Sequence, residues 1–226
     1  MEPSVFAGHS LGEYSALVAS EKLDFARGAR LVKKRGEAMD SLAPKGVGGM
    51  LAVVGYDGQS LAGLCQEISE EKKQVLEVAN YNSKSQQILS GHSEAIQLAQ
   101  QKLADQGVRV IPLPVSAPFH CSLMKPAARK MEKNIIKTKF YDPSVQIVSN
   151  VTAQATSNSD NIKKLLIEQI FSKVRWRESV EYMISNGVKE FIEVGPGKVL
   201  SGLIKRINDK VSSRSVNTIE EIKNLK

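Results

Sequence analysis

The chain has 226 residues, of which 42% are hydrophobic and 24% are charged, and its formal net charge is +7. This length allows one large domain, or one domain that carries a smaller insertion. The composition excludes a disordered or fibrous chain. No apolar run reaches the roughly 18 to 20 residues that a membrane-spanning helix needs. A cytoplasmic protein without membrane contact is therefore expected.

Cysteine and charge patterns narrow the possible partners. The two cysteines, Cys65 and Cys121, are too few for a disulfide framework and have no zinc-type spacing. We expect two free thiols and no metal. The positive charge favours an acidic partner, which could be a nucleic acid, an anionic cofactor or an acidic protein. Because the basic residues are scattered along helical stretches and only 5% of residues are aromatic, solvated helix faces are favoured over a nucleic-acid groove.

The first forty residues read as a strand, a tight turn and two helices. Residues 3–7 form a short apolar strand, residues 8–12 hold two glycines around a serine, and residues 13–19 favour a helix. Asp24 is a suitable N-cap for a second helix. Apolar residues recur there at helical spacing as far as Met39, and Pro44 with the glycines after it ends the pattern. Arg35 is therefore predicted to lie on a long helix.

Residues 49–113 alternate between strand and helix patterns. Strands are predicted over residues 50–54, 75–81, 86–89 and 108–113, and helices over residues 60–68 and 93–106, with Gly107 as the cap of the second helix. The order β-α-β-β-α-β is that of a ferredoxin-like subdomain.

The remaining half begins with a stiff segment. Pro112, Pro114 and Pro118 favour an extended chain that delivers His120 into a loop before a helix over residues 123–136. A strand is predicted at 145–148, helices at 162–171 and 179–185, a strand at 189–194, and a helix at 199–207. The residues beyond Asp209 are weakly patterned.

The segment Gly8-x-Ser10-x-Gly12 lies between a predicted strand and a predicted helix, which is the nucleophile-elbow pattern. The turn presents the serine hydroxyl at a helix N-terminus. There the Leu11 amide and the helix dipole can stabilise an oxyanion. The alternative, a glycine-bounded turn with an incidental serine, is weakened because strand and helix flank it in the expected order.

A serine nucleophile needs a base, and the chain has three histidines. The side chain of His9 should diverge from Ser10 in the elbow, and His92 lies at a predicted strand-to-helix junction that suits a surface or capping role. His120, on its proline-stiffened loop, is the remaining candidate. A lone loop histidine is also compatible with a purely structural role.

Four segments together resemble the malonyl-CoA:acyl carrier protein transacylases. They are Gly8–Glu13 (GHSLGE), Arg35–Met39 (RGEAM), Ser116–Met124 (SAPFHCSLM) and Glu193–Leu200 (EVGPGKVL). The resemblance covers about Pro3 to Ile207. It implies an α/β acyltransferase fold. Its large α/β-hydrolase-like subdomain would span residues 1–45 and 114–226, and an inserted ferredoxin-like subdomain would span residues 46–113.

The resemblance also implies roles for individual residues. Ser10 would take malonyl from coenzyme A as an ester and pass it to the phosphopantetheine thiol of acyl carrier protein, with His120 as base and then acid. The main-chain carbonyl of Arg175 would orient the histidine. Arg35 would bind the free malonyl carboxylate, since a guanidinium can hold a carboxylate through two parallel hydrogen bonds.

Further substrate contacts are implied at Leu11, Met39, Phe119 and Asn82. Phe119 resembles the residue of malonyl-selective acyltransferases, where a ring would crowd an α-methyl branch, although it could simply pack on the subdomain. Asn80 and Asn82 resemble pocket residues but are equally well explained as turn formers. Coenzyme A enters as a thioester substrate, so no cofactor is expected, and a monomer is expected.

The family has a segment before the elbow that carries a strand and an oxyanion-hole glutamine, and residues 1–3 of this chain align near the middle of the family domain. An N-terminally truncated member, incomplete in its large subdomain and with one oxyanion donor, is therefore expected. Two other readings stay open: a serine thioesterase or hydrolase, and a catalytically silent fragment that binds the carrier protein. Arg35 argues against the first, because a hydrolase of neutral acyl chains does not need a buried cation.

Overall fold

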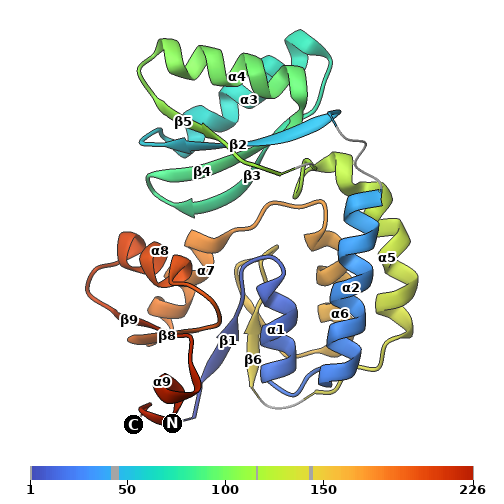
Figure 1. Ribbon diagram of the computed structural model, residues 1–226, viewed down its shortest axis with the longest axis vertical. Helices are drawn as coiled ribbons and strands as arrows, with labels where there is room; N and C mark the ends of the chain where they lie inside the picture. Colours follow the sequence, from blue (N-terminus) through green and yellow to red (C-terminus); the bar gives the residue numbers. More distant parts are fainter. Residues whose placement is uncertain (1, 42–45, 116, 143–144, 226) are drawn as a thin grey trace.

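The computed structural model describes residues 2–41, 46–115, 117–142 and 145–225. Three of the sequence predictions involve residues outside these ranges. They are Pro44, predicted to end the second helix, Lys45, the last residue before the predicted subdomain boundary, and Ser116, the first residue of the third motif. Figure 1 shows a sheet covered by helices at the top of the molecule and the remaining elements below it.

The elbow lies between a short strand and a helix, as the sequence predicts. Strand β1 (Val5–Ala7) leads into helix α1 (Gly12–Ala19), and helix α2 (Phe25–Ser41) follows. The Asp24 side chain caps α2, because its Oδ1 accepts a hydrogen bond of 2.9 Å from the Arg27 amide. Parallel pairing of β1 with β6 (Gln146–Val148) places Phe6 beside Ile147. A two-residue strand, β7 (Ala155–Thr156), pairs antiparallel to β6.

The upper sheet has the predicted ferredoxin-like topology. Its strands are β2 (Gly48–Val54), β3 (Leu76–Ser83), β4 (Gln86–His92) and β5 (Arg109–Pro112), in the spatial order β3-β4-β2-β5 with every neighbouring pair antiparallel. Helices α3 (Gly58–Lys72) and α4 (Ser93–Asp105) cover the sheet face turned away from the rest of the molecule (Figure 1). Between sheet and helices lies an apolar core that includes Leu51, Leu61 and Leu89.

The lower region has two cores. Helices α2, α5 (Lys125–Lys137, after the 3-10 turn Ser122–Met124) and α6 (Ser159–Gln169) pack side by side around the first. Helices α7 (Trp176–Ser185) and α8 (Val199–Ile207) enclose the second with β1, β6 and β8 (Glu190–Val194). The weakly patterned C-terminal segment also folds. It forms β9 (Ser212–Val216), parallel to β8, and the short helix α9 (Ile219–Lys223) with a Thr218/Glu221 capping box.

The lower strands are divided between two sheets. Within the described residues, β1 has one neighbouring strand, β6, and β8 has one, β9. Residues of both sheets nevertheless contribute to the same apolar core, which contains Val148 and Phe191. None of the helices in the described ranges combines the length and apolarity that crossing a membrane requires.

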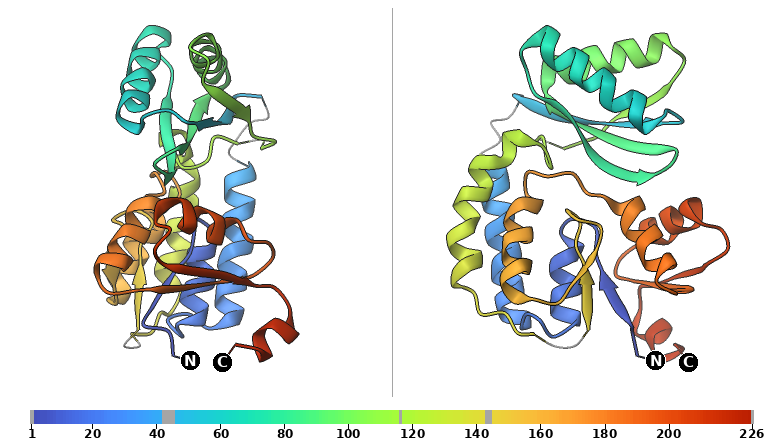
Figure 2. Two further views of the ribbon diagram at one scale, coloured as in Figure 1. Left: turned by 90° about the vertical axis from the view of Figure 1, so that its left-hand side faces the viewer. Right: turned by 180° about the vertical axis from the view of Figure 1, so that it is seen from behind.

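The connection between α6 and α7 joins the two regions. It runs beneath the upper sheet (Figure 2), and Val174 pairs with the outer strand β3. The Tyr81 amide donates to the Val174 carbonyl over 3.0 Å, and the Val174 amide donates to the Ala79 carbonyl over 2.8 Å. Its neighbour Arg175 donates its amide to the Asn150 carbonyl over 3.0 Å. This connection therefore fixes the upper sheet relative to the end of β6.

Candidate active site

Ser10 lies in a strained turn between β1 and α1. Its φ of 53° falls in the left-handed region, which is uncommon for a residue with a side chain. Gly8 is required by the close approach of the turn, since a Cβ there would lie 2.0 Å from the Gly12 carbonyl. A Cβ on Gly12 would meet nothing within 4 Å. Of the two glycines in the elbow pattern, only Gly8 is therefore required by a close contact.

His120 is the base partner of Ser10. Its Nε2 lies 2.6 Å from Ser10 Oγ, and its Nδ1 lies 2.9 Å from the Gln169 carbonyl oxygen. Since a carbonyl can only accept, Nδ1 carries the proton and Nε2 of the neutral ring is free to accept from the serine hydroxyl. Burial, with the nearby Arg35 charge, lowers the pKa of His120 to about 3. The histidine is therefore neutral, and able to act as a base, at physiological pH.

The Arg35 guanidinium lies beside the nucleophile. It comes from α2, is 5% exposed, and its Nη2 donates to Ser10 Oγ over 2.9 Å and to Gln169 Oε1 over 3.2 Å. Its Nε is buried and has no hydrogen-bond partner within the described residues. Burial lowers the pKa of Arg35, although an arginine stays charged. The site therefore holds a desolvated cation with donor capacity to spare, which suits a carboxylate ligand.

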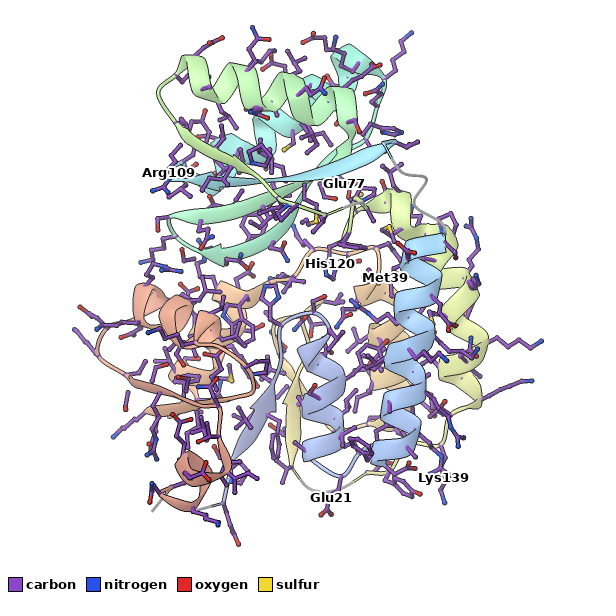
Figure 3. All side chains as sticks on the ribbon, in the orientation of Figure 1. Glu21, Met39, Glu77, Arg109, His120 and Lys139 are labelled. Carbon is purple, nitrogen blue, oxygen red and sulfur yellow. The ribbon has the colours of Figure 1, made fainter. Side chains whose placement is uncertain are left out.

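These three residues line one cavity of about 330 Å³. The sequence-predicted contacts Met39 and Phe119 also line it, together with His9, Gly36, Asp40, Met50 and Asn80. Figure 3 shows Met39 at the upper end of α2 and His120 in the loop under the small sheet. The cavity therefore has walls from both regions.

Two other predicted contacts are placed differently. Leu11 is 48% exposed and is not among the cavity-lining residues. Asn82 is also outside the lining, and its Oδ1 lies 2.9 Å from His9 Nε2. The His9 ring tilts against Trp176, so it diverges from Ser10 as expected. At the far end of β4, His92 Nδ1 accepts from the Val75 amide over 2.9 Å, which is a structural contact.

The predicted role of the Arg175 carbonyl is wrong. That carbonyl accepts from the amide and the hydroxyl of Ser179, each over 2.9 Å, while the Gln169 carbonyl holds His120. Gln169 is the last residue of α6, so its carbonyl has no intrahelical partner and is free to accept from the imidazole. One signal in the sequence could have found it, since Gln169 is a polar residue at helical spacing from the buried Ile162, Leu165 and Leu166.

Asn150 is a second residue that the sequence analysis missed. It follows β6, is 1% exposed, and holds both sides of the elbow. Its Oδ1 accepts from the Ser10 amide over 2.6 Å, and its Nδ2 donates to the Gly8 carbonyl over 2.7 Å. The strained turn is therefore held by a side chain from the segment that follows the neighbouring strand β6.

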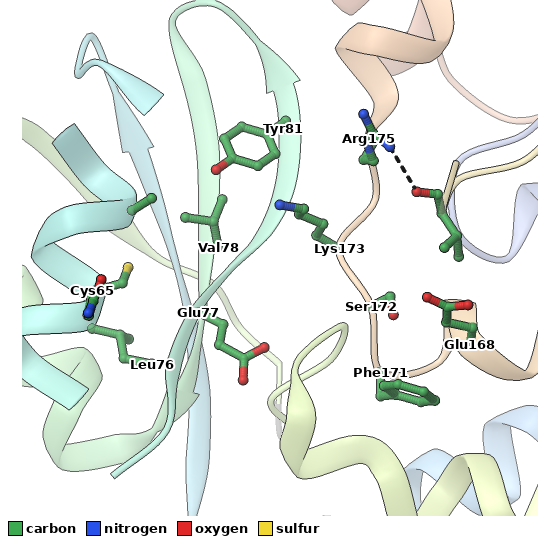
Figure 4. Close-up of a pocket in the computed structure, with 13 residues that line it drawn as sticks. Cys65, Leu76, Glu77, Val78, Tyr81, Glu168, Phe171, Ser172, Lys173 and Arg175 are labelled. Atoms are coloured by element: carbon green, nitrogen blue, oxygen red, sulfur yellow. Dashed lines mark hydrogen bonds between the residues drawn. The ribbon is translucent and has the colours of Figure 1, made fainter. Parts of the chain in front are cut away.

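A larger cavity, of about 480 Å³, is lined by Arg175 but not by Ser10, Arg35 or His120. It lies between α3 and β3 on one side and the α6–α7 connection on the other (Figure 4). Its Lys173 ammonium lies 5.3 Å from the centre of the Tyr81 ring, and its Glu77 carboxylate accepts from the Ser122 amide.

Cys65 and Cys121 are both buried and form no disulfide. In the ranges that the structure describes, no cluster of three or more histidine, cysteine or acidic residues could hold a metal ion.

Comparisons with known proteins agree with this geometry. Residues 1–222 match the acyl transferase domain family. The malonyl CoA-acyl carrier protein transacylase of Escherichia coli K12 is 45% identical over 216 residues, which cover 95% of this chain and 69% of the relative. The structure of the Coxiella burnetii transacylase superposes with a TM-score of 0.95 at 38% identity and covers 99% of this chain and 71% of the other.

A malonyl-transacylase solved in complex with a type II PKS acyl-carrier protein also superposes with a TM-score of 0.95, at 38% identity, covering 99% of this chain and 72% of the other. The similarity extends over nearly the whole chain, in sequence and in fold. The chain belongs to the acyl transferase domain family and, within it, to the malonyl CoA-acyl carrier protein transacylases.

Proposed function

We propose that this chain transfers the malonyl group of malonyl-CoA to the phosphopantetheine thiol of acyl carrier protein in fatty acid biosynthesis, through an ester on Ser10. The observation that carries the residue assignment is the buried Arg35 guanidinium 2.9 Å from Ser10 Oγ, inside the cavity that also holds His120. A substrate with a free carboxylate beside its reactive thioester fits this pairing.

In the first step Ser10 Oγ attacks the thioester carbonyl while His120 Nε2 takes the hydroxyl proton. The Gln169 carbonyl stabilises the imidazolium through Nδ1–H, as a carboxylate does in other serine enzymes. The Leu11 amide, at the start of α1, is the proposed donor to the oxyanion. Collapse of the tetrahedral intermediate breaks the carbon–sulfur bond, and the departing thiolate of coenzyme A takes the proton from His120.

The second step reverses the first with a different thiol. The phosphopantetheine thiol gives its proton to His120 and attacks the malonyl ester, and Ser10 leaves with that proton restored. Arg35 keeps the malonyl carboxylate in place during both steps. A charge-assisted hydrogen bond of this kind is worth about 1.5–3 kcal/mol. Phe119 lines the cavity beside His120, which supports a preference for malonyl over α-branched groups.

Several expectations from the sequence belong to this proposal as predictions. The reaction needs no cofactor besides the coenzyme A thioester, and the protein acts as a cytoplasmic monomer. The division into residues 1–45 with 114–226 and residues 46–113 also stays a prediction. To these predictions we add Lys125, Lys198, Lys205 and Arg206 as candidate contacts for coenzyme A phosphates or the acidic carrier.

The decisive experiment is intact mass spectrometry after incubation of the purified chain with malonyl-CoA. A malonyl adduct is expected on the wild type and none on Ser10→Ala. Retained malonylation of Ser10→Ala would overturn the assignment of the nucleophile. Release of free malonate without any transfer to acyl carrier protein would favour the hydrolase reading, and carrier binding without an adduct would favour the silent fragment.

An Arg35→Ala arm of the same experiment tests the carboxylate contact. The variant should lose about 10- to 100-fold in malonylation rate, which corresponds to one charge-assisted contact, while acetyl-CoA, which lacks the carboxylate, is much less affected. Equal losses for the two thioesters would contradict the role of Arg35.

A further inference from the structure

Glu13 is a buried acid that the proposed reaction does not use. It lies in the first turn of α1, just after the elbow, and is 3% exposed. Its Oε2 accepts from Gln169 Nε2 over 2.8 Å and from the Asn150 amide over 3.2 Å. Both donors are neutral groups. Burial is costly for such a carboxylate, and it raises the pKa of Glu13 to about 7.

Both the nitrogen and the oxygen of the Gln169 side-chain amide make hydrogen bonds. Nε2 donates to the Ser10 carbonyl over 2.9 Å and to Glu13 over 2.8 Å, while Oε1 accepts from Arg35 over 3.2 Å. A flipped amide would place its oxygen against two acceptors and its hydrogens against a guanidinium. In the Glu13 contact Gln169 donates to a carboxyl oxygen, which can accept a hydrogen bond in either protonation state of the acid.

The Gln169 side chain also sets the position of the Gln169 main-chain carbonyl, which holds His120. The carbonyl is the 2.9 Å acceptor for His120 Nδ1 and lies at the free C-terminal end of α6. An anchor on the same residue therefore fixes where the base sits relative to Ser10. Gln169 thus contacts the nucleophile's residue, the base and the guanidinium at once, and Glu13 holds Gln169.

We propose that Glu13 is a positioning residue for acyl transfer, which acts through the Gln169 amide to align His120 and Arg35 with Ser10. The proposal rests on the proposed function, since it assigns Glu13 a part in that same reaction. A misplacement of about 1 Å in a catalytic group can cost about 10²-fold in rate. Loss of the Glu13 anchor is therefore expected to slow the chemistry without removing any catalytic residue.

The test compares Glu13→Ala with Glu13→Gln in single-turnover malonylation followed by rapid-quench intact mass spectrometry. The amplitude counts competent sites, and the rate constant reports the chemistry at each site. Glu13→Ala is expected to lower the rate constant by about 10²-fold. Glu13→Gln keeps an amide oxygen where Oε2 accepts and should stay within about fivefold of the wild type. Glu132→Ala, an exposed site on α5, is the matched control and should change neither quantity.

A reduced amplitude with an unchanged rate constant in Glu13→Ala would mean that Glu13 only supports folding, and it would overturn the proposal. Sulfonylation of Ser10 by phenylmethylsulfonyl fluoride separates this outcome from failure of the proposed function, because it needs Ser10 and His120 but no malonyl group. If the wild type is sulfonylated but not malonylated, the proposed function fails and the sulfonylation rates still decide the role of Glu13. Equal sulfonylation rate constants in wild type and Glu13→Ala would overturn the positioning role of Glu13. A sulfonylation rate constant that is lower in Glu13→Ala and close to wild type in Glu13→Gln would support that role.

Discussion

The upper sheet and the catalytic region below it are held together in different ways. In the upper region, β2 and β4 pair over their full seven residues, from Gly48↔His92 to Val54↔Gln86, and both helices pack on one apolar face. In the catalytic region the strands at the site are three residues long. Side chains from distant segments hold its turn: Asn150 contacts Gly8 and Ser10, and Gln169 contacts Ser10 and Glu13.

The difference shows where stability and geometry come from in this fold. A long ladder over an apolar face is stabilised by many similar contacts, so no single polar group decides its shape. The elbow is a strained turn, and such a conformation persists only where its surroundings hold it. We therefore expect substitutions in the core between the upper sheet and its helices to affect unfolding alone, and substitutions around the elbow to affect the rate as well.

The largest expected effect comes from a matched pair of core leucines. Leu89 lies in the upper core and Leu166 lies on α6 close to Gln169, and both are fully buried. Either change to alanine should lower the free energy of unfolding by about 2–5 kcal/mol. Leu89→Ala should leave the malonylation rate constant per competent site unchanged, whereas Leu166→Ala should lower it. Chemical denaturation measures the free energy of unfolding, and single-turnover kinetics measure the rate constant. Equal rate constants in the two variants would contradict the proposed difference between the two regions.

The same contrast explains how far the sequence could predict the fold. Periodicity over residues 49–113 was sufficient for the ferredoxin-like order, because each element buries its own apolar face locally. The strand β9 was missed, because its Ser-Ser-Arg-Ser-Val sequence is polar and its pairing with β8 decides its conformation. Propensity cannot reveal a strand whose stability comes from its neighbour.

The candidate site divides in a similar way. Ser10, Arg35 and His120 were predictable because each lies in a recognisable motif. The structure brings Arg35 and His120 within hydrogen-bond distance of Ser10 Oγ. The acceptor for His120 was assigned to the wrong residue, because it is a main-chain carbonyl, and the one indirect signal was the polar side chain of Gln169 on the buried face of α6. Asn150 was missed for a related reason. Its contacts span 140 and 142 positions of the sequence, and no local pattern reports them.

The next effect in size separates the elbow from an ordinary capping site. Asn150→Ala leaves the Ser10 amide and the Gly8 carbonyl without their partner, which should cost about 1–3 kcal/mol of unfolding free energy for a buried polar group and should also slow malonylation. Asn158→Ala is the control, since Asn158 caps α6 through a 2.9 Å bond to the Asn161 amide. Its loss should cost about 0.5–2 kcal/mol with no change in rate. A normal rate in Asn150→Ala would show that the elbow keeps its geometry without this contact.

The smallest expected effect is a pH dependence of stability to which two buried groups contribute with opposite signs. Burial lowers the pKa of His120 to about 3 and raises that of Glu13 to about 7. In the unfolded chain these groups titrate near 6.5 and 4.5. Between pH 5 and 7 the unfolded histidine binds more protons than the folded one, so its contribution to stability rises with pH. The folded Glu13 binds more protons than the unfolded one, so its contribution falls over the same interval.

Each of these two contributions amounts to about 2 kcal/mol across this interval, and they have opposite signs. Burial also lowers the pKa of His9, so this residue adds a rise with pH in the wild type and in both variants. From pH 5 to pH 7 the free energy of unfolding of Glu13→Gln should rise by about 2 kcal/mol more than that of the wild type, and that of His120→Gln should rise by about 2 kcal/mol less. Urea denaturation of the three proteins at the two pH values measures both differences. Differences of the same sign in the two variants would mean that Glu13 and His120 are not desolvated as the structure has them.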